Sequence, residues 1–227
     1  MNTDFESLIS ELTQPLNGQY PRPWMTKLRD LLQAKVFIVG KNQATEFTLE
    51  KVGTHDRHMD SLFNRNGESC RGLYDEVTKG NPSRTRPNID DLTQRLESKG
   101  VHEILETNVI CYSTPMSSHL AKQIHTGGRQ RGDEIFQTLL SYIRPSILIV
   151  HGADTSKKLG RSLKANLPSP PSKPDDLVIV RLDYDGYKPL VFVIPSLVQP
   201  AFNTWRRWGP AHLDNVAVAV AGHLGRL

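Results

Sequence analysis

The chain has 227 residues, of which 37% are apolar, and its mean hydropathy is −0.43. That length suits one domain with a buried core, and the longest apolar run is too short for a membrane span, which excludes an integral membrane protein of the helical class. The net charge of +4 is weak evidence for a nucleic-acid partner. The first 20 residues lack a secretory pattern, so we expect a cytoplasmic protein.

An N-terminal helical extension is predicted for residues 1–34, packed on a single domain that comprises residues 1–227. Apolar periodicity predicts a first helix over residues 2–16. Two prolines then precede a second predicted helix over residues 24–33, which leads into the first strand.

The run KVFIVGKN at residues 35–42 ends in a glycine, a cation and an amide side chain. Such a run is typical of a buried parallel strand, and open α/β sheets place their ligands at the carboxyl ends of these strands. Three later runs end in a similar way, at residues 108–112, 147–152 and 190–196. We therefore expect four strand ends with polar groups to share one crevice.

Predicted helices alternate with these strands and follow them to the end of the chain. They cover residues 68–78, 89–98, 133–143, 153–166, 198–207 and 213–223. A turn at residues 183–186 predicts a late hairpin. The alternation predicts the α/β class: a three-layer α/β/α domain with a central, mostly parallel four-stranded sheet.

Polar residues at the predicted strand ends are the candidate site residues. Gly40 permits an unusual turn, and the amide of Asn42 could orient a water molecule, although the two could equally turn the chain. Asn108 either caps a backbone irregularity or presents a donor–acceptor pair to a pyrimidine edge. Ser196, directly after Pro195, either caps the next helix or contacts a phosphate.

Cofactor signatures are missing from the sequence. Neither a Walker A loop nor a G-x-G-x-x-G motif is present, and the two cysteines, Cys70 and Cys111, form no C-x-x-C pair. We interpret both cysteines as buried, inert thiols, and we expect no metal and no cofactor.

Basic residues cluster near predicted loops and helix ends, as in proteins that grip a phosphate backbone. For any one cluster, a solvated surface is the alternative. The clusters contain Arg84 and Arg86, Arg129 and Arg131, residues 157–164, and residues 205–208.

Three short motifs resemble those of the uracil-DNA glycosylase superfamily. They are G-x-N after the first strand, T-N with a later proline in the second, and P-S at the last strand end, in order between residues 35 and 204. The resemblance implies that Asn42 orients the hydrolytic water, that Asn108 reads a flipped base and that Ser196 touches the DNA backbone.

The resemblance also implies roles for the neighbours of these motifs. Phe63, or alternatively Phe47, would stack on the flipped base. The residues Gly40, Lys41 and Gln43 would line the base pocket, and Pro195 and Leu197 would belong to a loop that enters the duplex.

The sequence departs from the superfamily pattern in two places. Gln43 stands where many members have proline, and Ile194 occupies the place of a histidine that stabilises charge on the departing base. Loss of such a donor costs on the order of 10²–10³ in rate. Either another group substitutes, with His151 and His125 as the candidates, or the base leaves more easily, or the chain does not catalyse.

The function expected from this resemblance is a monofunctional DNA glycosylase. It would flip out and excise a deaminated, damaged or modified pyrimidine, leaving an abasic site, in repair or in defence against modified foreign DNA. DNA is then the expected partner, with no membrane, no obligate protein partner and a monomeric chain. Two alternatives are a non-catalytic DNA-binding module with the same fold and a hydrolase of small nucleosides or nucleotides.

Overall fold

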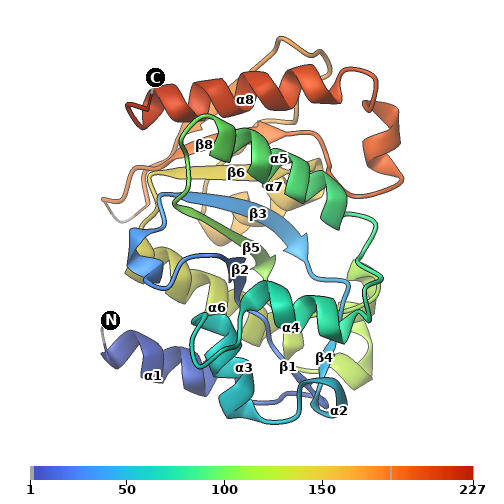
Figure 1. Ribbon diagram of the computed structural model, residues 1–227. Coiled ribbons are helices and arrows are strands. Elements are labelled where there is room, and N and C mark those ends of the chain that lie inside the picture. The colour runs from blue at the N-terminus through green and yellow to red at the C-terminus, as the bar shows by residue number, and fades with distance from the viewer. Residues whose placement is uncertain (1–2, 185, 227) are drawn as a thin grey trace. The chain divides into compact units, whose positions relative to one another are not determined.

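The computed structural model describes residues 3–184 and 186–226, and it has an α/β fold (Figure 1). The chain divides into two compact units. Unit 1 contains residues 1–34, 40–82 and 105–144, and unit 2 contains residues 35–39, 83–104 and 145–227.

Unit 2 contains residues 36–39 of strand β3 and the whole of strands β6, β8 and β7, which follow β3 in that order across the sheet. The strands β3 (Val36–Asn42), β6 (Ile147–His151) and β8 (Leu190–Ile194) are parallel, and β7 (Val178–Arg181) is antiparallel to β8. In register, Val36 pairs with Ile147, and His151 pairs with Ile194. The apolar runs form these strands because their side chains are buried on both faces, as is typical of parallel sheets.

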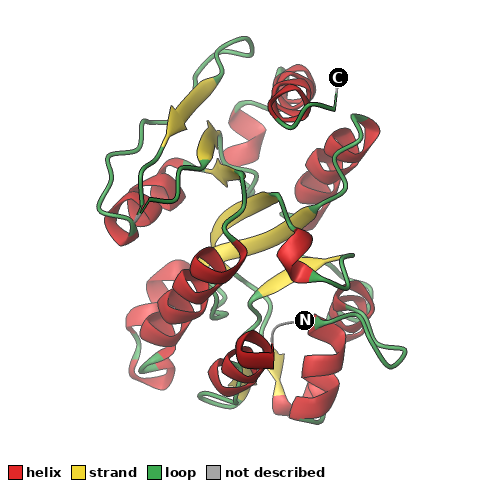
Figure 2. Cartoon of the chain, turned by 90° about the vertical axis from the view of Figure 1, so that its left-hand side faces the viewer, coloured by secondary structure: helices red, strands yellow, loops and turns green. Residues whose placement is uncertain are grey.

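Helices cover both faces of this sheet, and Figure 2 shows helices on either side of the strands. The helices α5 (Arg86–Ser98) and α8 (Gly209–His223) share one apolar core with β3, β6 and β8, to which the short helix η4 (Ala201–Thr204) adds Phe202. Helix α7 (Ala153–Ser162) packs against β6. The predicted three-layer α/β/α class with a mostly parallel sheet is therefore confirmed. The predicted number of strands is wrong, because the sheet has six described strands and four were expected.

Unit 1 is mainly helical and has two short antiparallel strand pairs. Strand β1 (Gln19–Tyr20) pairs with β4 (Phe47–Thr48), and β2 (Trp24–Thr26) pairs with β5 (Ile104–Ile110). Its helices are α1 (Thr3–Leu12), α2 (Leu49–Val52), α3 (His55–Leu62), α4 (Cys70–Val77), α6 (Gly128–Ile143) and the 3₁₀ turns η1 (Leu31–Gln33), η2 (Ser117–Ala121) and η3 (Gln123–His125).

The predicted helix over residues 24–33 is wrong. Residues 24–26 form β2, and only residues 31–33 are helical, as a 3₁₀ turn capped by Asp30. Trp24 forms a strand because it is buried and because residues 24–26 pair with residues 105–107 of β5, a partner far along the chain. Long-range pairing of this kind overrides local periodicity.

Other predicted boundaries also shift. The helix predicted over residues 2–16 ends at residue 12, and residue 2 lies outside the described residues. Helix α6 starts at residue 128, five residues earlier than predicted, and η4 replaces most of the helix predicted over residues 198–207. Three elements that the sequence did not indicate, β4, α2 and α3, lie between residues 47 and 62.

Helix α6 comes close to the end of β5 at Gly132. A Cβ atom at this position would lie 2.8 Å from the backbone nitrogen of Cys111 and 2.8 Å from Cγ2 of Ile110. Because backbone is one of these neighbours, it cannot move aside as a flexible side chain would. We expect Gly132→Ala to lower the free energy of unfolding by about 2 kcal/mol, measured by urea denaturation, despite the better helix propensity of alanine.

The matched control for this glycine is Gln130→Ala, an exposed position of the same helix. It should leave the free energy of unfolding within about 0.5 kcal/mol of the native value. Equal stability of Gly132→Ala and the native chain would contradict the close contact between α6 and β5.

Candidate functional site

The side chain of Asn42 is held by three neighbours in unit 1. Its Nδ2 donates to Oγ1 of Thr114 (3.0 Å) and to the carbonyl oxygen of Gln43 (3.2 Å), and Oγ of Ser117 donates to its Oδ1 (2.6 Å). Thr114 is anchored in turn, because its backbone N–H donates to the carbonyl of Gln43 at 2.9 Å. The end of β3 is thus tied to the segment that follows β5.

This network fixes which way the Asn42 amide faces. A backbone carbonyl can only accept, so the side toward Gln43 must be the NH₂ group, and Oδ1 must face Ser117. A carbonyl oxygen has two lone pairs, and the Ser117 hydroxyl uses one of them. The second lone pair can therefore accept a hydrogen bond from a water molecule, which is the chemistry expected of Asn42.

The residues around Asn42 differ from the expectation in their roles. Strand β3 runs through Gly40 and Lys41 to Asn42, so the predicted turn at Gly40 is wrong. The side chain of Gln43 is buried, where Nε2 donates to the carbonyl of Arg22 and Oε1 accepts from Ser113. Gln43 thus holds neighbouring segments together, and its amide is not presented to a base in this structure.

Asn108 lies half-buried near the end of β5. Its backbone carbonyl accepts from Sγ of Cys111 at 3.1 Å, and its side-chain amide makes no hydrogen bond to another described residue. The side chain therefore does not cap a backbone irregularity. A half-buried amide without a partner retains both its donor and its acceptor for a ligand.

Neither candidate stacking ring is accessible. Phe63 and Phe47 are each 1% exposed. The ring of Phe63 packs edge-on against Trp24 at 5.6 Å, and the ring of Phe47 packs edge-on against His58 at 6.1 Å. Stacking on a base would require either ring to leave the core, so the structure gives both a packing role.

His151 ends strand β6 in unit 2. It is 5% exposed, its Nδ1 has no hydrogen-bond partner among the described residues, and burial lowers its pKa to about 4. The imidazole is therefore neutral at pH 7 and carries an unused N–H donor. Such buried and unpartnered polar groups are rare in proteins and are concentrated at functional sites.

The other histidine candidate has a structural role. His125 is buried, and its Nδ1 lies 3.2 Å from the hydroxyl of Tyr112. That hydroxyl also accepts from Nδ2 of Asn17 at 3.0 Å. The ring of His125 thus belongs to a contact that fixes the segment after β5.

The segment after β8 presents one residue that the sequence did not single out. Pro195 and Leu197 are buried, whereas Val198 is 44% exposed. Oγ of Ser196 accepts from the backbone N–H of Val198 at 3.2 Å, and a Cβ atom at Gly152 would lie 3.3 Å from the Ser196 side chain. Leu197 could enter a DNA duplex only if its side chain left the core. Val198 is therefore the apolar side chain that is accessible in this loop.

The four candidate phosphate-binding arginines fall into two pairs. Arg84 and Arg129 are exposed. Arg86 is buried and forms an ion pair with Asp90 at 2.8 Å, and Arg131 donates to the carbonyl of Leu12 and pairs with Glu134. Arg84 and Arg129 are therefore accessible to a ligand. Arg86 and Arg131 would have to give up contacts within the chain before they could bind one.

Among residues 3–184 and 186–226, no group of three or more His, Cys, Asp or Glu side chains could hold a metal ion. Cys70 and Cys111 are buried, and burial raises the pKa of each thiol to about 12. Neither is therefore a nucleophile at neutral pH.

No protein-family model matches the chain, and no curated protein matches it either. Within the described part of the chain, none of the helices combines the length and apolar character that crossing a bilayer requires.

Proposed function

We propose that the chain is a monofunctional DNA glycosylase that hydrolyses the N-glycosyl bond of a deaminated, damaged or modified pyrimidine. The observation that carries the proposal is the state of two polar side chains of unit 1, near the ends of β3 and β5. Asn42 is fixed with one lone pair unused, and the Asn108 amide is unpartnered among the described residues. Resemblance of the strand-end motifs to the uracil-DNA glycosylase superfamily supports the same assignment.

In this proposal the two asparagines divide binding and chemistry. The amide of Asn108 pairs with the edge of a flipped pyrimidine, which carries adjacent donors and acceptors. Oδ1 of Asn42 accepts a hydrogen bond from water and directs its oxygen toward the anomeric carbon as the glycosidic bond breaks. Ser117 is a positioning residue, because its hydroxyl holds Oδ1 in place.

The role proposed for His151 is to stabilise negative charge on the departing base. A neutral imidazole donates a hydrogen bond without giving up a proton, and a donor in a water-poor site stabilises developing charge strongly. Ile194, which stands in the place of the superfamily histidine, is its direct partner across the sheet. The donor would thus have moved to the neighbouring strand.

The experiment that tests this function uses purified protein and labelled oligonucleotides containing uracil, hypoxanthine or one of several modified cytosines. Alkali cleaves the strand wherever a base has been removed. We expect one of the pyrimidine substrates to give an abasic product, and Asn42→Ala to give none with the same substrate.

The two alternatives give different results in the same assay. A non-catalytic DNA-binding module would bind the oligonucleotides in a salt-dependent manner and yield no product. A small-molecule hydrolase would release bases from free nucleosides and would show no such affinity for DNA. Product that persists in Asn42→Ala would refute the role of Asn42.

A further inference from the structure

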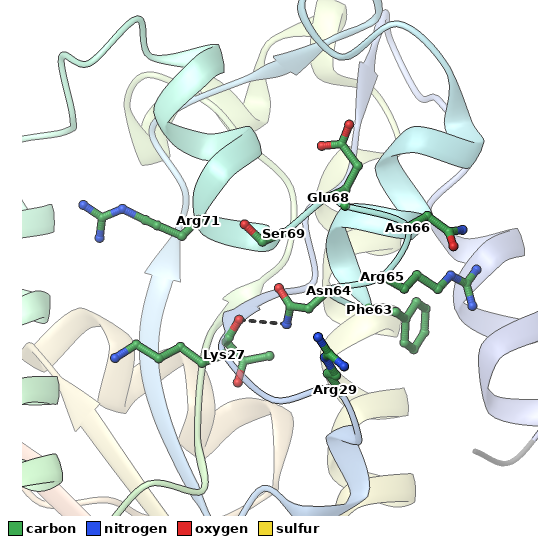
Figure 3. Close-up of a pocket in the computed structure, with 11 residues that line it drawn as sticks. Lys27, Arg29, Phe63, Asn64, Arg65, Asn66, Glu68, Ser69 and Arg71 are labelled. Atoms are coloured by element: carbon green, nitrogen blue, oxygen red, sulfur yellow. Dashed lines mark hydrogen bonds between the residues drawn. The ribbon is translucent and has the colours of Figure 1, made fainter.

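A pocket of ≈ 730 Å³ lies in unit 1. Its lining contains neither Asn42 nor Asn108, but it includes Phe63, whose ring packs on Trp24. Its walls come from the segment after β2, the loop between α3 and α4, and the first turn of α4. Figure 3 shows Lys27 and Arg71 on one side of the opening, Arg29 and Arg65 on the other, and Asn64 between them. The volume is in the range of small-molecule binding sites.

The walls of this pocket are fixed by the amide of Asn64. Its Nδ2 donates to the carbonyls of Thr26 (3.1 Å) and Leu28 (2.8 Å), and its Oδ1 accepts from the backbone N–H of Cys70 (3.0 Å). One side chain thus joins all three segments of the wall. The pocket is therefore formed before a ligand binds, which lowers the entropy cost of binding.

The lining carries four cations and one carboxylate. The carboxylate, Glu68, is paired with Arg57 at 2.8 Å, and Arg65 is paired with Asp60 at 2.8 Å and with Glu6. Arg71 pairs with Asp75 on the surface, where both side chains are exposed and such a pair is easily exchanged for a ligand. Lys27 and Arg29, both exposed, add positive charge at the rim.

The remaining polar groups of the lining are suited to an anion. Asn66 and Ser69 supply further donors, and Ser69 caps α4, whose N-terminus adds a positive dipole end at the pocket. Arginine forks match the oxygens of phosphate in a bidentate manner. We propose that this pocket binds the phosphate of a nucleotide unit, supplied either by a nucleic-acid strand or by a free nucleotide.

This inference rests on the proposed function and extends it. A strand phosphate bound in this pocket would give DNA a second point of attachment, separate from Asn42 and Asn108. Its test does not depend on base excision. The probes are a fluorescein-labelled single-stranded oligonucleotide of ordinary bases and free thymidine monophosphate. Affinity is measured by anisotropy for the oligonucleotide and by calorimetry for the nucleotide, at two salt concentrations.

The test variant is Lys27→Gln/Arg29→Gln, which removes two rim charges at exposed positions. We expect its affinity for the oligonucleotide to fall about tenfold and the salt slope to fall by about 1.4, as for two lost phosphate contacts on a single strand. The control, Lys51→Gln/Lys173→Gln, changes the net charge equally at exposed residues outside the lining. It should change the affinity less than twofold.

The outcomes separate the source of the phosphate and the two proposals. Loss of nucleotide binding alone in the test variant supports the pocket and assigns a free nucleotide as its ligand. Loss of oligonucleotide binding without any abasic product on the base panel supports the pocket while the glycosylase function fails. Equal affinities of the native chain, test variant and control, or no binding of either probe, overturn the pocket proposal.

Discussion

Replacing His151 with leucine is expected to lower the single-turnover rate of base excision by about 10²–10³-fold, the usual effect of removing one donor to developing charge. Leucine suits the buried end of β6, so the strand should still form. Because the histidine is proposed to act in the transition state, the affinity for the substrate oligonucleotide should change less than about threefold.

A conservative variant separates the proposed role from a structural one. His151→Gln retains an N–H donor, so part of the lost rate should return, whereas a packing role would favour leucine. The native rate should also stay level from pH 7 to pH 5, because the ring stays neutral and keeps its N–H donor over this interval. A native-like rate for His151→Leu would refute the assignment.

The parallel strands of unit 2 could be predicted from the sequence because their signal is local. The runs at residues 147–150 and 190–194 are short, apolar and rich in β-branched residues, and both form the predicted strands. Helix α5 was equally readable from its period and from Gly100 after its end. The class of fold follows from such local patterns and their alternation.

The state of each candidate side chain could not be predicted, because its partners lie far along the chain. The side chain of Asn42 is hydrogen-bonded to Thr114 and Ser117, which lie 72 and 75 positions further along the chain. No spacing rule connects residues so far apart. The three amides of Asn42, Gln43 and Asn108 look alike as sequence, yet the first is fixed, the second buried and the third unpartnered. The sequence likewise does not show that the rings of Phe63 and Phe47 are packed in the core, because their partners Trp24 and His58 come from other segments of the chain.

Unfolding at mildly acidic pH is the second large effect that we expect. Burial lowers the pKa of both His58 and His151 to about 4, whereas an exposed histidine in the unfolded chain has a pKa near 6.5. The unfolded state therefore binds more protons below pH 6.5, and the free energy of unfolding must fall as pH drops from 6.5 toward 4. Linkage gives a loss of about 2 kcal/mol for each histidine by pH 5.

Urea denaturation at pH 7.0 and pH 5.0 measures this loss. The interval lies above the titration of Asp60 and Glu76, whose pKa values are lowered by hydrogen bonds from Arg65 and Arg57, so these carboxylates contribute little. His151→Leu should remove about 2 kcal/mol of the pH dependence. The rest should remain, because His58 is still buried against Tyr20 with its Nδ1 unpartnered, and burial also lowers the pKa of His55 and His212. If the native chain were equally stable at both pH values, the two imidazoles could not both be buried and neutral. The same burial that makes His151 a competent hydrogen-bond donor at pH 7 would thus make the fold sensitive to acid.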